Sequence, residues 1–113
     1  MIVHIARKFE WEQAQRTGVY RSASLAQDGF IHCSNVDQVI DIANKLFRGQ
    51  TDLALLCIDE ALVAHLVKYE DLYQTQEPYP HIYGALNGDA ITSVVDFKPG
   101  TDGLFSLSDA LRH

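Results

Sequence analysis

Short apolar runs, separated by glycine, proline and acidic residues, divide this chain into a series of short segments. Ile2–Ala6 is rich in β-branched residues, and Leu53–Ile58 is apolar throughout, which is typical of a central strand buried on both faces. His81–Leu86, entered through Pro80, and Ala90–Phe97 are the next predicted strands. These four runs provide most of the expected sheet.

Helical spacing occurs in two stretches. Arg7–Thr17 is predicted to be a helix that ends at Gly18, since glycine readily adopts the conformation that terminates helices. Apolar residues recur every three or four positions along Val36–Phe47, which predicts an amphipathic helix capped by Ser34 or Asn35.

The remaining segments are predicted to be shorter or irregular. They are an irregular or extended segment at Val19–Ser24, a capped helical turn at Asp59–Leu62, a strand at Val63–Tyr69, loops at Leu72–Pro80 and Lys98–Gly103, a turn or short helical link at Asn87–Ala90, and a short strand with a frayed helical end at Leu104–Leu111. Helices and strands mix without regular alternation, which indicates an α+β fold: a curved, largely antiparallel sheet with helices packed on one side. We expect one domain over residues 1–113.

The stretch Asp28–Ser34 combines a turn, a short apolar run, an imidazole and a hydroxyl. Side chains alternate along a strand, so His32 and Ser34 are expected on one face and Ile31 and Cys33 on the other. The strand would then present a polar pair at its carboxyl end. A structural interpretation is equally consistent, with Ser34 as a helix cap and His32 as a half-buried histidine.

Composition and charge restrict the class of protein. The chain is 47% apolar, which suffices for a core, and its net charge of −6 disfavours general nucleic-acid binding. A local pocket for a phosphate remains compatible with that charge. Cys33 and Cys57 lie in apolar runs, so both are expected to be buried and reduced. No run suggests a signal peptide or a membrane span, which predicts a soluble, cytoplasmic protein. We expect it to be a monomer.

Three histidines, His4, His32 and His81, lie in strand-like apolar contexts, where an imidazole needs a polar partner. A three-histidine metal site is conceivable, but no ligand spacing or carboxylate motif supports it, so no metal is expected. A nucleophile built from Cys33 and a histidine is also disfavoured, because Cys33 and His32 have opposite strand parity.

The region around the proline-containing loop offers further candidates. Tyr83 shares a face with His81, and Glu70 is either a general base, a ribose-binding carboxylate or a solvated charge at a strand end. Tyrosines cluster here, at Tyr69, Tyr73, Tyr79 and Tyr83. They either pack under the loop or form a stacking wall for a flat ring. The chain contains no phosphate-binding glycine motif of the usual kinds.

Several short sequence motifs occur together along the chain. They are the N-terminal His-Ile pair, Trp11, Gly29–Ser34 (Gly-Phe-Ile-His-Cys-Ser), Leu55–Asp59, Tyr69–Glu70 and Pro80–Gly84 (Pro-His-Ile-Tyr-Gly). In this order they resemble the bacterial "domain of unknown function 952" family over nearly the whole chain. That family resembles the ADP-ribosyltransferase fold, including its RNA 2′-phosphotransferase branch. The resemblance implies a split, curved sheet around a cleft for NAD or an ADP-ribosylated ligand.

The resemblance also implies residue roles. The ligand-binding residues would be His4 on the first strand, Ser34 on the second, and Tyr83 as a stacking group. The third-strand position would belong to Glu70, or else to His81 with Tyr83. The catalytic residues would be His32, His81 and Glu70, with NAD as a possible substrate and no required cofactor. The Arg-Ser-Glu and His-Tyr-Glu triads of transferases have no evident match in the chain. The alternative is a non-catalytic module that binds a small ligand or another protein on the same fold.

Overall fold

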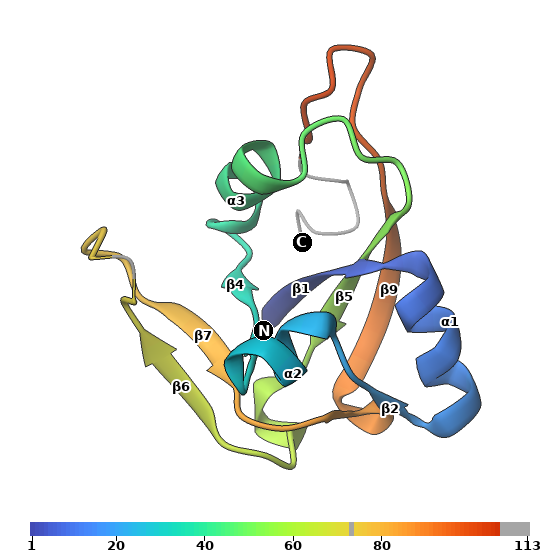
Figure 1. The fold of residues 1–113 in the computed structure, drawn as a ribbon, viewed down its shortest axis with the longest axis vertical. Coiled ribbons are helices and arrows are strands. Elements are labelled where there is room, and N and C mark those ends of the chain that lie inside the picture. The colour runs from blue at the N-terminus through green and yellow to red at the C-terminus, as the bar shows by residue number, and fades with distance from the viewer. Residues whose placement is uncertain (73, 107–113) are drawn as a thin grey trace.

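The computed structural model describes residues 1–72 and 74–106 of the chain. Every strand pairing in these ranges is antiparallel, and the longest strands form a four-stranded main sheet of order β4-β1-β5-β9 (Figure 1). Its strands are β1 (Ile2–Arg7), β4 (Ser34–Asn35), β5 (Leu53–Ile58) and β9 (Ile91–Phe97). The expected α+β class with antiparallel pairing is therefore confirmed.

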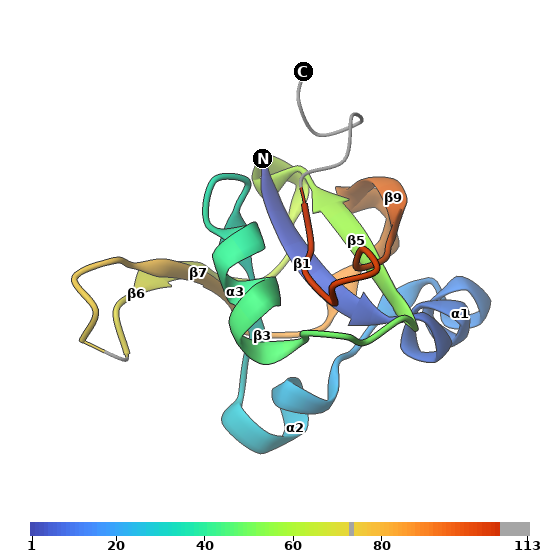
Figure 2. The ribbon, with the colours of Figure 1, turned by 90° about the horizontal axis from the view of Figure 1, so that it is seen from above.

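Two smaller sheets accompany the main sheet. The second sheet has the order β3-β7-β6, from β3 (Ile31–His32), β7 (Tyr79–Ile82) and β6 (Val67–Glu70), and a small third sheet pairs β2 (Val19–Tyr20) with β8 (Leu86–Asn87). The helices are α1 (Lys8–Thr17), α2 (Ala23–Asp28) and α3 (Val39–Leu46), with single turns η1 (Glu60–Leu62) and η2 (Gly88–Ala90). The β6–β7 hairpin extends away from the main sheet in both views (Figures 1 and 2).

The core lies on both faces of β5, as the apolar run predicted. All six residues of β5 are buried between β1 and β9. On one face Leu55 and its neighbours pack against Val39 and Ala43 of α3. On the other face Leu56 belongs to a cluster that includes Ala14 of α1. Helices therefore cover both faces of the main sheet, and the expectation that they pack on one side was wrong.

The main sheet is split beside β1, and this split positions the candidate site. β1 pairs with β5 from Ile2 to Arg7, but it pairs with β4 only at Ile2 and Val3. The backbone N–H of Cys33 instead donates to the carbonyl of Pro80 at 3.0 Å, and β3 joins the second sheet. In the described part of the chain, the edge of β1 beyond Val3 therefore has no strand beside it.

Several predicted elements have different limits in the structure. Val19–Ser24 was expected to be irregular or extended, yet α2 begins at Ala23 and ends before Gly29, whose φ is 84°. The predicted helix Val36–Phe47 begins only at Val39, and neither Ser34 nor Asn35 caps it. Ser34 belongs to β4 instead, and the Asn35 N–H donates to the side chain of Gln38.

The second half of the chain follows the predictions more closely. The helical turn after Ile58 is capped as expected, because the Asp59 carboxylate accepts from the N–H of Ala61. The predicted strand His81–Leu86 is divided between β7 and β8. Residues 107–111 of the last predicted segment lie outside the described residues. No helix in the described ranges combines the length and apolar character that crossing a bilayer requires.

Candidate functional site

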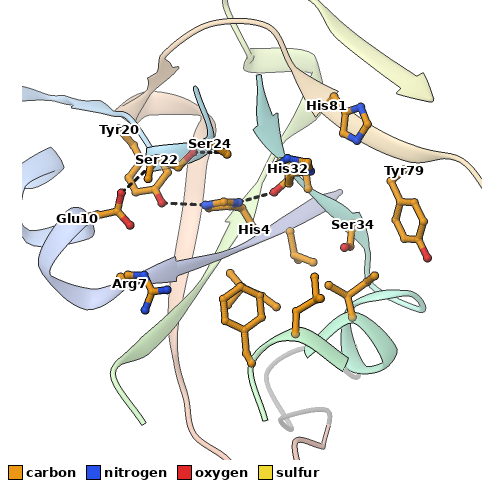
Figure 3. Close-up of a pocket in the computed structure, with 17 residues that line it drawn as sticks. His4, Arg7, Glu10, Tyr20, Ser22, Ser24, His32, Ser34, Tyr79 and His81 are labelled. Atoms are coloured by element: carbon orange, nitrogen blue, oxygen red, sulfur yellow. Dashed lines mark hydrogen bonds between the residues drawn. The ribbon is translucent and has the colours of Figure 1, made fainter. Parts of the chain in front are cut away.

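A cleft of about 330 Å³ lies against the open edge of β1. Residues from β1, α1, the β2–α2 segment, the β3–β4 segment, α3 and β7 line it. Figure 3 shows His4 between two groups of polar side chains: Arg7, Glu10, Tyr20, Ser22 and Ser24 on one side, and His32, Ser34, Tyr79 and His81 on the other. The cleft thus follows from the split in the sheet.

His4 is buried in the wall of the cleft and connects three elements. Its Nδ1 lies 2.5 Å from the carbonyl oxygen of His32, and its Nε2 lies 2.8 Å from the hydroxyl of Tyr20. A carbonyl only accepts, so Nδ1–H donates to His32 and Nε2 accepts from Tyr20. Burial lowers the pKa of His4 to about 4 and raises the pKa of Tyr20. Both groups are therefore neutral near pH 7.

His32 and Ser34 were predicted to share one face of a strand. Both line the cleft, although Cys33 between them also reaches its wall. His32 is partly exposed, and its Nε2 pairs with the Asp28 carboxylate at 2.9 Å, which ties β3 to the end of α2. Ser34 is buried. The prediction that these two side chains share one face is consistent with this arrangement.

His81 lies directly opposite His32 in the β3–β7 pairing, with ring centroids 5.4 Å apart. The His81 side chain is 2% exposed, and its ring stacks on Phe30 at a centroid distance of 4.3 Å. Its Nδ1 lies 3.0 Å from Oε1 of Glu70. Stacking and the hydrogen bond together fix the plane and the rotation of this imidazole.

Glu70 also accepts a hydrogen bond from the Tyr83 hydroxyl, at 2.5 Å on the same oxygen. The hydrogen bond from Tyr83, followed by that from His81, lowers the pKa of Glu70, while the bond to Glu70 raises the pKa of Tyr83. The structure thus brings Glu70, His81 and Tyr83 together. Only His81 lines the cleft; Glu70 binds His81 from outside the lining, and Tyr83 binds Glu70.

The described tyrosines of the predicted stacking wall do not line the cleft together. Tyr79 lines the cleft, whereas the Tyr69 hydroxyl donates to Glu60 and Tyr83 binds Glu70. Tyr73 lies outside the described residues. The role of Tyr83 as a stacking group in the cleft therefore finds no geometric support.

Sequence reasoning missed several lining residues. Arg7 and Glu10 were assigned to the predicted helix without a role, and Tyr20, Ser22 and Ser24 lay in a segment expected to be irregular. Glu10 accepts from the N–H of Ala23, and the hydroxyls of Ser22 and Ser24 lie 2.7 Å apart. The shared strand parity of Tyr20 and Ser22 was the available signal.

Cysteine and metal chemistry gain no support from the geometry. Burial raises the pKa of the Cys33 thiol, so this thiol stays protonated and is a poor nucleophile. Both ring nitrogens of His4 are already hydrogen-bonded, which leaves none for a three-histidine metal site. Within residues 1–72 and 74–106, no group of three or more histidine, cysteine, aspartate or glutamate side chains is placed to hold a metal ion.

A family model described as "Protein of unknown function (DUF952)" matches residues 5–94. No curated protein matches the chain. The crystal structure of protein CC0527 from Caulobacter crescentus is similar, with 33% identity, a TM-score of 0.89, and coverage of 99% of this chain and 98% of that chain. The solution NMR structure of CC0527 gives 33% identity, a TM-score of 0.83, and coverage of 98% and 96%.

Proposed function

The chain belongs to the DUF952 family, and we propose that its cleft binds a nucleotide-type ligand, either NAD or an ADP-ribosyl or phosphorylated nucleotide. The observation that carries this proposal is the convergence of His32, Ser34, His81 and Arg7 in the lining of one cleft. Specific ligand pockets combine apolar walls with a few polar groups in this way.

The two sides of the cleft match the two parts of a nucleotide. Ile42, Leu46 and Phe47 form an apolar wall at α3, suited to a flat ring. Tyr20 and Ser22 provide hydroxyl groups opposite, suited to a ribose. The volume of about 330 Å³ lies near the lower end of typical pockets, about 300–1,000 Å³, so the cleft fits half of a dinucleotide better than the whole.

Arg7 supplies positive charge for a phosphate. Among the described residues that line the cleft, it is the one lysine or arginine. Its guanidinium makes a 3.3 Å hydrogen bond to Gln50 near the surface. A phosphate would accept hydrogen bonds from the planar fork of this side chain. The net charge of −6 is compatible with such binding, because the charge of the cleft itself decides it, and Arg7 and Glu10 are the lysine, arginine, aspartate or glutamate residues of the described lining.

A second candidate function is a non-catalytic ligand-binding module on the same fold. The observation that favours it is the position of Glu70, whose carboxylate is absent from the cleft lining. An enzyme that transfers an ADP-ribosyl group would release nicotinamide from NAD, whereas a binding module would hold the ligand unchanged. Both candidate functions therefore predict ligand binding, but only the enzyme predicts that a product forms.

Calorimetric titration with NAD and with ADP-ribose tests the proposal. Arg7→Gln should weaken binding about 10-fold or more, because a hydrogen bond to a charged group contributes about 1.5–3 kcal/mol. Arg16→Gln is the matched control, since Arg16 is exposed on α1 and lies outside the cleft lining. Nicotinamide release separates the enzyme from the module. Absence of binding at millimolar ligand, an affinity of only about 4 kcal/mol, would refute the nucleotide site.

A further inference from the structure

Nε2 of His81 is a buried polar atom that has no hydrogen-bond partner within residues 1–72 and 74–106. The side chain is 2% exposed, yet the residue lines the cleft. Buried polar side-chain atoms in proteins are rarely left unpaired, and an exception calls for an explanation. A ligand atom in the cleft is the partner that the position of His81 makes available.

The contacts of the ring determine which atom faces the cleft and what it can do. Nδ1 is directed at Glu70, which lies outside the cleft lining, so the other edge of the ring, with Nε2, is left for the cleft. An ionised carboxylate only accepts, so Nδ1 carries the hydrogen. In the neutral imidazole, Nε2 then has a free lone pair and can accept a proton.

We propose that His81 is the catalytic base of the cleft, acting through Nε2, with Glu70 and Tyr83 as its positioning residues. This inference rests on the proposed function. The acceptor is a hydroxyl compound, water included. Its O–H bond breaks and the proton passes to Nε2, while the oxygen bonds to C1′ of the ribosyl group. The C–N bond to the nicotinamide breaks, and its electron pair leaves with the neutral nicotinamide.

The charged groups around His81 suit this role. Glu70 on β6 would pair with the imidazolium that forms, and its own partner Tyr83 holds the carboxylate in place. Lys68 is the β6 residue opposite His81 in the pairing, and its ammonium lies 5.3 Å from the Tyr83 ring centroid. His32 faces His81 from β3 and is paired with Asp28. Glu70 is thus the carboxylate in direct contact with His81.

A variant and its control test the function of Nε2 separately from the contact that Nδ1 makes with Glu70. An asparagine amide can replace Nδ1 as the donor to Glu70 but has nothing at the Nε2 position, so His81→Asn removes the base and keeps the positioning contact. His65→Asn is the control, because His65 is an exposed histidine outside the cleft lining. Nicotinamide release from NAD should fall at least about 100-fold in His81→Asn and stay unchanged in His65→Asn. Thermal melting confirms that each variant is folded.

Glu70→Gln and Tyr83→Phe test the positioning roles. Loss of the carboxylate should lower kcat with little change in KM, and it should move the acidic limb of the pH–rate profile to lower pH. Tyr83→Phe should have a smaller effect in the same direction. A merely structural role would change the melting temperature and leave the pH profile in place.

Nitrogen-15 spectra of the histidine-labelled protein decide the inference independently of NAD. In the neutral ring of His81 they should show a proton on Nδ1 and none on Nε2, and this result supports the proposal. A proton on Nε2 in the neutral ring overturns it, as does a folded His81→Asn variant that releases nicotinamide at the parent rate. If the parent neither binds NAD nor releases nicotinamide, the proposed function fails, and the protonated nitrogen alone then decides whether His81 can be a base.

Discussion

The hydroxyl of Tyr20 donates a hydrogen bond to Nε2 of His4 across 2.8 Å of buried space. The opposite nitrogen, Nδ1, donates to the carbonyl of His32. One neutral imidazole therefore joins β2, β1 and β3 at the place where the main sheet is split. This side-chain bridge replaces the strand that β1 lacks beyond Val3, and it forms a wall of the cleft at the same time.

The buried His4 predicts a loss of stability in acid. Its pKa is lowered from 6.5 to about 4 in the folded protein, so between these values the unfolded chain binds more protons. Stability is therefore complete above about pH 6.5 and falls as the pH decreases toward 4, by about 3 kcal/mol in total. The lowered pKa of Glu70 acts in the same direction at more acidic pH.

Urea denaturation at pH 7 and pH 4.5 measures this effect, with His4→Asn as the comparison. The variant retains a donor for the His32 carbonyl but has no group that titrates near neutral pH. It should be less stable than the parent at pH 7 and should lose about 2–3 kcal/mol less between the two pH values. Equal losses in the two proteins would show that His4 does not contribute to acid sensitivity.

Tyr20→Phe should destabilise the protein by about 1–3 kcal/mol, because Nε2 of His4 would be buried without a partner. Tyr69→Phe is the matched control: the Tyr69 hydroxyl also hydrogen-bonds, to Glu60, but its side chain is half exposed. The control should cost less than about 0.5 kcal/mol. Similar free energies of unfolding for the two variants would contradict the structural role assigned to the His4–Tyr20 pair.

Helices and strands with a long apolar pattern could be predicted from the sequence, whereas those with a short pattern could not. Leu53–Ile58 could be predicted because six consecutive apolar residues leave few alternatives. The helix of α2 could not, since it has six residues and none of them is fully buried, so no apolar stripe marks it. The strand switch at Cys33 was also hidden, because two short strands in different sheets have the same alternation as one continuous strand.

The candidate site also has a part that could be predicted from the sequence and a part that could not. Strand parity predicted a shared face for His32 and Ser34, and both line the cleft with His81, although Cys33 of the opposite parity lines it too. Local sequence carries no information on which side of a neighbouring strand forms the cleft, so the position of Glu70 outside it could not be foreseen. The place of Arg7 in the cleft lining, at the end of β1, depends on the missing neighbour strand, which is a property of the tertiary fold.

Leu55→Ala tests the central position of β5. Leu55 is fully buried between β1 and β9, so the truncation should cost about 2–5 kcal/mol through lost burial and a cavity. Val94→Ala on β9 is the control, because Val94 is 39% exposed and should cost less than about 1 kcal/mol. Denaturant titration of both variants measures the difference. A cost under about 1 kcal/mol for Leu55→Ala would place this strand at an edge.

Ser34→Ala separates ligand binding from folding. Ser34 lines the cleft and does not cap α3, so no helix-cap energy is lost with its hydroxyl. No hydrogen bond of this hydroxyl occurs within the described residues, and its removal should change the free energy of unfolding by less than about 0.5 kcal/mol. Affinity for NAD or ADP-ribose should fall about 2–10-fold, the value of one neutral hydrogen bond to the ligand.

The matched control for this prediction is Ser106→Ala, a serine outside the cleft lining, which should alter neither quantity. Calorimetry and thermal melting are run on the parent and both variants. A Ser34→Ala protein that melts several degrees below the parent would show that the hydroxyl stabilises the β3–β4 segment. Unchanged affinity in a stable Ser34→Ala protein would remove Ser34 from the ligand contacts, and the nucleotide would then lie nearer to Arg7 and Tyr20 on the other side of His4.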